Sequence, residues 1–115
     1  PASMKAALDM LAESPGRRIA ILGGMGELGE GAGLMHAEVG AYARAKGIDL
    51  LLAVGAFHEH TVNGFGEGPV HAFADQEALL AALPSLVAGP ATVLVKGSRS
   101  ARMERVVHTL IEEQH

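Results

Sequence analysis

The sequence of 115 residues has no cysteine and no tryptophan, and only 3% of its residues are aromatic. Without cysteine it has neither a disulfide framework nor a thiolate metal site, a composition compatible with a reducing compartment. With few aromatic side chains it has little on which nucleic-acid bases stack. Its net charge of −4 gives no basic surface for a phosphate backbone. We therefore expect a cytoplasmic protein that binds no nucleic acid.

Long apolar runs are also missing. The longest, from Ile48 to Phe57, contains Asp49 and is too short to span a bilayer, and no signal-peptide pattern is present. Hydrophobic residues make up 49% of the chain and charged residues 19%, which is typical of a globular protein rather than a disordered tail. Because the length is that of one domain, we expect a single domain over residues 1–115 with no membrane insertion.

What the sequence does contain is an alternation of strands and helices. Short apolar segments predict strands at 18–22, 50–54, 70–73 and 92–95. Helical spacing of apolar residues predicts helices at 3–13, 34–46 and 76–83, with a weaker candidate at 56–64. The last helix shows the spacing at Met103, Val106, Val107 and Leu110. Because parallel strands need crossover helices, this order predicts an α/β fold, a three-layer Rossmann-like domain with a mostly parallel sheet flanked by helices.

Ligands in such sheets bind beyond the carboxyl ends of the strands, and one strand exit has a composition suited to an anion. The segment from Lys96 to Ser100 brings two cations, two hydroxyls and the amides of a following helix to one place. A carboxylate or phosphate there would gain charge-assisted hydrogen bonds, with Arg99 able to bind it bidentately. Alternatively, Ser100 only caps the helix while Lys96 and Arg99 are solvated.

A second exit, the glycine-rich loop from Gly23 to Gly33, contains the pattern G-x-G-x-x-G from Gly24 to Gly29. In a dinucleotide-binding domain this pattern turns backbone amides toward a pyrophosphate. The acidic ribose ligand of that motif is missing, however, since Asp49 lies at the wrong end of its strand. The lysine and hydroxyl of a Walker A loop are missing too. The glycines alternatively allow only a tight turn and close helix packing.

The histidines give no clear site. His58-Glu59-His60 can be interpreted as a metal pair, but three potential ligands in a row seldom converge, so a surface loop is expected. His36 either faces the glycine-rich loop or flanks the core, and the sequence leaves both open. No metal site is predicted, and no nucleophile with its base is present.

Three segments together resemble the C-terminal domain of the Mur ligase family, and within it the ligases that add D-alanyl-D-alanine. Their order and spacing match along the whole chain. The segments are Pro1-Ala2-Ser3-Met4 with Ala6-Ala7-Leu8, then Leu22-Gly23-Gly24-Met25-Gly26-Glu27-Leu28-Gly29 with His36-Ala37-Glu38-Val39-Gly40, and Lys96-Gly97-Ser98-Arg99-Ser100 with Met103-Glu104.

The resemblance implies part of an ATP-dependent ligase of peptidoglycan synthesis, a process tied to cell shape and cell division. ATP would phosphorylate the terminal carboxylate of UDP-N-acetylmuramoyl-tripeptide, and the amine of D-alanyl-D-alanine would then attack the acyl phosphate. The N-terminal UDP-substrate domain and the central ATPase domain are expected to be absent from this chain. ATP and Mg²⁺ would be bound mainly by that central domain, which leaves no catalytic residue here and an inactive isolated domain.

The resemblance also implies two binding loops. A nucleotide-facing loop falls on Gly23, Gly24, Met25 and Glu27. A second-substrate loop falls on Lys96, Ser98, Arg99 and Ser100. Where the family has an acidic residue this chain has Gly24, so that Glu27 or backbone groups replace the carboxylate, or the nucleotide contact is weaker. The alternatives are a stand-alone Rossmann-like nucleotide- or dinucleotide-binding module and a purely structural α/β interaction domain.

Overall fold

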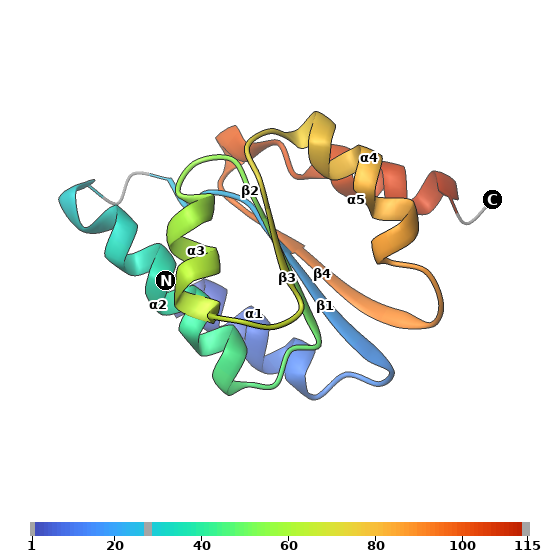
Figure 1. Cartoon of the computed structure of the whole chain (residues 1–115), viewed down its shortest axis with the longest axis horizontal. Coiled ribbons are helices and arrows are strands. Elements are labelled where there is room, and N and C mark those ends of the chain that lie inside the picture. The colour runs from blue at the N-terminus through green and yellow to red at the C-terminus, as the bar shows by residue number, and fades with distance from the viewer. Residues whose placement is uncertain (1, 27–28, 114–115) are drawn as a thin grey trace.

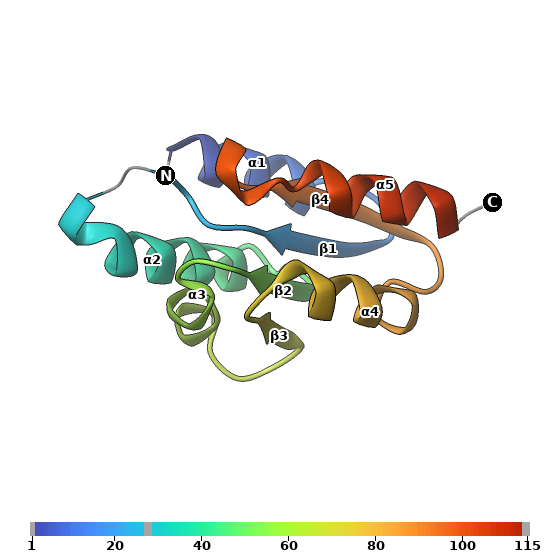
Figure 2. The ribbon, with the colours of Figure 1, turned by 90° about the horizontal axis from the view of Figure 1, so that it is seen from above.

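A computed structural model describes residues 2–26 and 29–113 and contains one four-stranded sheet (Figure 1). The strands are β1 (Arg17–Leu22), β2 (Leu50–Val54), β3 (Val70–Phe73) and β4 (Ala91–Lys96). They lie in the order β3-β2-β1-β4, and every neighbouring pair is parallel. All four arrowheads therefore point in the same direction in Figure 2. The predicted α/β fold with a parallel sheet is confirmed.

Helices cover both faces of the sheet, which gives the three layers that the sequence predicts. The helices α1 (Ala2–Ala12), α2 (Ala32–Ala45) and α3 (His58–Phe65) lie on one face, and α4 (Gln76–Leu86) and α5 (Glu104–Glu113) on the other (Figure 1). Two short 3₁₀ turns precede helices, η1 (Gly29–Gly31) before α2 and η2 (Arg99–Ala101) before α5. The weak helix candidate at 56–64 is confirmed as α3.

Side chains of the central strand β1 contribute to both hydrophobic cores, one on each face of the sheet. Successive side chains of a strand point to opposite faces, so Ile19 and Ile21 pack with α4 and α5 while Ala20 and Leu22 pack with α1 and α2. Ile19, Ala20 and Ile21 are all 0% exposed. A continuous apolar run, rather than an alternating one, is therefore what this position requires.

Two helices differ from the prediction. Helix α2 begins at Ala32 rather than at residue 34, and its buried face centres on His36, Val39 and Gly40. Helix α3 packs against this face so closely that a Cβ atom at Gly40 would overlap the Thr61 carbonyl oxygen. Only a glycine allows the two helix backbones to come this close.

The apolar stripe predicted for the last helix is wrong at Val107, which is 40% exposed, whereas Met103 and Val106 are buried. Strand β4 lies at the edge of the described sheet. All six of its residues are only partly buried. Val107 lines an open groove with Val93 and Val95 of β4, so this edge of the sheet leaves it partly uncovered.

The strand order also determines where a ligand can bind. From β1 the chain runs outward to β2 and β3, then returns to the other side of β1 as β4. The boundary between β1 and β4 is thus the topological switch point of the sheet. The two loops singled out in the sequence leave the sheet at this boundary, one after Leu22 and one after Lys96.

Candidate functional site

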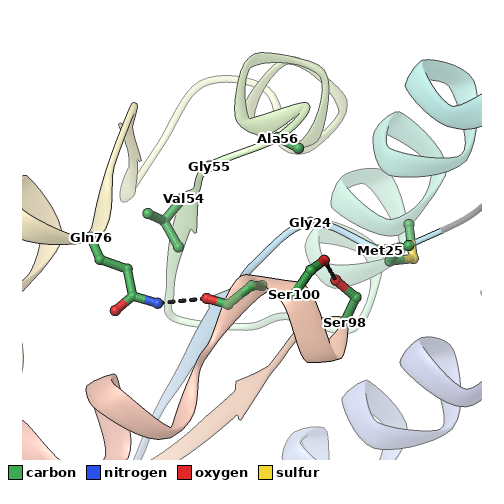
Figure 3. A pocket seen from close by; sticks show the side chains of 10 residues that line it. Gly24, Met25, Val54, Gly55, Ala56, Gln76, Ser98 and Ser100 are labelled. Atoms are coloured by element: carbon green, nitrogen blue, oxygen red, sulfur yellow. Dashed lines mark hydrogen bonds between the residues drawn. The ribbon is translucent and has the colours of Figure 1, made fainter.

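A cavity of about 400 Å³ opens at the carboxyl ends of β1, β2 and β4 (Figure 3). The loops after β1 and β4 contribute to its walls together, as their strand exits predict, and the loop after β2 and the start of α4 complete it. The lining residues are Gly24, Met25, Gly26, Val54, Gly55, Ala56, Gln76, Ser98, Ser100 and Ala101.

Main-chain hydrogen bonds join the loops after β1 and β4. The Gly23 amide donates to the Lys96 carbonyl at 2.8 Å, and the Ser98 amide donates to the Gly24 carbonyl at 2.9 Å. The loops also approach closely, since a Cβ atom at Gly97 would lie 3.2 Å from the Cα of Gly23. The two loops therefore form one frame, held by backbone atoms and by glycine.

These bonds argue against the dinucleotide interpretation. The amides of Gly23 and Met25 already donate within the protein, to Lys96 and to His36, and are not turned toward a ligand. The third glycine of a dinucleotide motif allows close helix packing. Here Gly29 has a φ of +68°, and a Cβ atom on it would meet nothing within 4 Å. The pattern G-x-G-x-x-G is thus present without its geometry.

Asp49 lies at the amino ends of the strands, whereas the cavity opens at their carboxyl ends. Its carboxylate accepts hydrogen bonds from the Arg18 amide at 2.8 Å and from the Arg18 guanidinium at 3.3 Å. The backbone hydrogen bond from Arg18 is the main reason that the pKa of Asp49 is lowered. Asp49 therefore ties the amino ends of β1 and β2 together and is no ribose ligand.

The expected nucleotide-facing loop is only partly accessible. Gly23 and Gly24 are buried and Met25 is half-buried, while Glu27 lies outside the described residues. At Gly24, where the resemblance leads us to expect an acidic residue, a Cβ atom would lie 3.1 Å from the Cβ of Ala56 and 3.2 Å from its carbonyl oxygen. A side chain there requires the loop after β2 to move by a few tenths of an ångström.

The expected second-substrate loop reaches this cavity only through Ser98 and Ser100, whereas Lys96 lines a separate hollow with Ser3 and Met4, and Arg99 lines an open one with Gly26. Lys96 and Ser98 are half-buried, whereas Arg99 and Ser100 are exposed. The two serine hydroxyl oxygens lie 3.0 Å apart. Within residues 2–26 and 29–113, no carboxylate lies within ion-pairing distance of Lys96 or Arg99.

One expectation for this loop is wrong. Helix α5 begins only at Glu104, after the turn η2 and after Arg102, which has a φ of +51°. The N-terminal amides of α5 therefore do not belong to the loop from Lys96 to Ser100. Its capacity for an anion depends on its side chains and on the turn itself.

Gln76 is a site residue that the sequence analysis missed. Its side-chain amide donates to the carbonyls of Ala101 and Arg102 at 2.6 and 2.9 Å, which joins the start of α4 to η2 (Figure 3). Its Oε1 atom is buried and has no hydrogen-bond partner among the described residues. One feature of the sequence could have indicated Gln76. It directly follows Asp75, whose carboxylate caps α4 by accepting a hydrogen bond from the Ala78 amide.

The histidines are now placed. His36 is buried and bonded to the loop after β1. His58 and His60 lie in the first turn of α3 rather than in a surface loop, and the His58 Nδ1 atom lies 2.7 Å from the Gly55 carbonyl.

Nowhere in the described ranges do three His, Asp or Glu side chains gather to hold a metal ion. None of the described helices is long and apolar enough to cross a membrane.

Comparison with known proteins connects this geometry to a family. A sequence model described as "Mur ligase, glutamate ligase domain" matches residues 1–99. The UDP-N-acetylmuramoyl-tripeptide--D-alanyl-D-alanine ligase of Escherichia coli (strain K12) is 47% identical over 115 residues, which cover 96% of this chain and 24% of that protein. The chain thus spans about a quarter of the length of this relative.

Solved structures agree. A crystal structure of MurF from Acinetobacter baumannii matches with a TM-score of 0.89 and 31% identity, over 97% of this chain and 26% of that one. MurF ligase from Thermotoga maritima in complex with ADP matches with a TM-score of 0.78 and 26% identity, over 98% of this chain and 26% of that one. Sequence and structure lead to the same conclusion: the chain belongs to the Mur ligase family.

Proposed function

We propose that this chain is the C-terminal domain of a cytoplasmic ATP-dependent ligase that joins D-alanyl-D-alanine to UDP-N-acetylmuramoyl-tripeptide. The observation that carries the proposal is the placement of Lys96 and Arg99 at the switch point, where each lines a hollow with Gly26 of the glycine loop and neither pairs with a carboxylate of the described residues. Its relative from Thermotoga maritima is described in complex with ADP, which supports a nucleotide as one ligand of the complete enzyme.

In this proposal each loop has a separate task. Lys96 and Arg99 hold the carboxylate of the incoming dipeptide, so that its amine approaches the acyl phosphate in a fixed orientation. The glycine loop borders the nucleotide, and closure of the domain excludes water from the acyl phosphate. The amine attacks the acyl carbon, phosphate leaves and an amide forms.

We assign Mg²⁺ mainly to the central ATPase domain that the family resemblance implies. When bound, the ion would neutralise phosphate charge during transfer. We likewise assign the phosphorylation step to the central ATPase domain that the family resemblance implies. The role left to this domain is to bind and orient substrates and to exclude water.

Kinetics of the complete ligase carrying Lys96→Glu or Arg99→Glu tests the proposal. A charge-assisted hydrogen bond contributes about 1.5–3 kcal/mol, so we expect the KM for D-alanyl-D-alanine to rise roughly 10- to 150-fold, with little change in the KM for ATP. Arg105→Ala is the matched control, since Arg105 is exposed on α5 and faces Glu77 at 4.0 Å. An unchanged requirement for the dipeptide in both charge-reversed variants contradicts the proposal.

A further inference from the structure

His36 is the one buried histidine of the described residues, and the proposed function gives it no task. It lies in the first turns of α2 and is 2% exposed. Its Nε2 atom accepts a hydrogen bond from the Met25 amide at 2.9 Å. Its Nδ1 atom lies 2.7 Å from the Ala32 carbonyl. Both ring nitrogens are thus used inside the protein.

These two bonds determine the chemical form of the ring. The Ala32 carbonyl oxygen can only accept, so Nδ1 must carry a hydrogen atom. The Met25 amide can only donate, so Nε2 must present a lone pair. The geometry therefore admits one form of His36, the neutral imidazole with its hydrogen on Nδ1.

The ring also connects a third segment. Phe57, in the loop after β2, stacks on His36 with ring centroids 4.8 Å apart and an interplanar angle of 27°. Phe57 has a φ of +61°, which is a strained conformation for a bulky residue, and remains 41% exposed. A conformation of this kind persists only where its surroundings fix it. The stack on His36 is one such restraint, and it lies beside the cavity wall formed by Gly55 and Ala56.

The segment that His36 holds is the glycine loop itself. Three consecutive residues of that loop are restrained: the Gly23 amide by Lys96, the Gly24 carbonyl by Ser98, and the Met25 amide by His36. The first two restraints come from the backbone of the neighbouring loop. His36 supplies the third, and it is the only one of the three provided by a side chain.

We propose that His36 is a positioning residue, which holds the Gly23–Met25 loop in the form that borders the nucleotide through its bond to the Met25 amide. The effect on nucleotide binding rests on the proposed function, whereas the bond and its tautomer do not. Since Nε2 is the atom that accepts, a glutamine at this position can place its Oε1 at a similar reach. A leucine fills similar space and leaves the Met25 amide without a partner.

The first test is nuclear magnetic resonance of residues 1–115 with ¹⁵N-labelled histidine. The expected result is a protonated Nδ1 and an unprotonated Nε2 at neutral pH, together with slow exchange of the Met25 amide hydrogen. We expect His36→Leu to speed that exchange about tenfold or more and His36→Gln to restore most of the protection. His60→Leu is the matched control, because His60 touches the edge of the same Phe57 ring but makes no bond to the loop. A wild-type ring protonated on Nε2 overturns the proposal even if no variant folds.

The second test uses the complete ligase. We expect His36→Leu to raise the KM for ATP at least fivefold more than the KM for D-alanyl-D-alanine, and His36→Gln to recover most of it. A loss of folded protein alone would lower the amount of active enzyme and would not separate the two KM values. If the resonance results hold and both KM values stay unchanged, the nucleotide role of the loop is refuted, while the bond between His36 and Met25 stands. If exchange of the Met25 amide is the same in His36→Leu as in the wild type, the positioning role itself is refuted.

Discussion

The contact between α2 and α3 gives a sharp prediction for Gly40→Ala. In an ordinary helix this change is favourable by about 1 kcal/mol, because alanine has the higher helix propensity. Here the added methyl group would overlap the Thr61 carbonyl oxygen and lie 2.9 Å from the Phe65 nitrogen. Both are main-chain atoms of α3, so no side chain can turn away to make room.

The expected cost follows from this geometry. Overpacking a well-packed interior typically costs about 1–3 kcal/mol, and a collision with rigid backbone belongs at or above the upper end. After subtraction of the gain in propensity, we expect a net loss of about 2 kcal/mol in the free energy of unfolding. For a domain of this length, that lowers Tm by roughly 8 °C.

Urea unfolding followed by circular dichroism measures the effect as a lower midpoint at an unchanged slope. Ala41→Gly is the matched control, because Ala41 is exposed in the same helix and should lose only about 1 kcal/mol in helix propensity. Gly64→Ala meets the Ala37 carbonyl oxygen across the same contact. One separation of the helices relieves both collisions, so the double variant should lose less than the sum. A Gly40→Ala protein as stable as the wild type would refute the close contact.

Three further outcomes are expected. The hydrogen bond from Tyr42, followed by that from Lys46, lowers the pKa of Asp9, so the contribution of Asp9 to stability is complete above about pH 4 and is lost as the pH falls further. The unfolding midpoint should therefore fall less steeply with decreasing pH in Asp9→Asn than in the wild type, and an equal slope would contradict this. Gly24→Asp in the complete ligase should lower the KM for ATP about tenfold relative to Gly24→Ala, which shares the contact with the loop after β2 but lacks the carboxylate. Leu52→Ala, at a side chain 0% exposed, should cost about 2–5 kcal/mol in urea unfolding, and a loss below 1 kcal/mol would contradict the assigned core.

Much of the fold was predictable because local pattern and tertiary position agree. The apolar run from Ile19 to Leu22 predicts a strand covered on both faces, and β1 is such a strand. The helical spacing over 76–83 predicts α4, and the structure begins this helix at Gln76, directly after Asp75, whose carboxylate accepts from the Ala78 amide. Val107 follows the same helical spacing as Val106 but remains exposed in an open groove beside β4, because spacing predicts a helix face and not how completely other elements cover it.

The site was predictable only in part, for a related reason. Strand exits after Leu22 and Lys96 follow from strand assignment alone, and the sheet order then brings them together. His36 was left open because its partner, the Met25 amide, lies 11 residues away in a loop without periodicity. Gln76 was missed because its partners are carbonyls of η2, 25 and 26 residues further along the chain. Hydrogen bonds to main-chain atoms leave no mark in the sequence of the acceptor.

The frame formed by the loops after β1 and β4 has a consequence for how such a domain changes over generations. Its shape depends on main-chain hydrogen bonds and on the close approach of Gly97 to Gly23. The side chains at positions 98, 99 and 100 do not hold it together. Under the proposed function, substitutions at these three positions exchange one ligand preference for another while the scaffold stays intact. On that proposal, an engineer who seeks a ligase for a different amine should diversify these positions first and keep the glycines fixed.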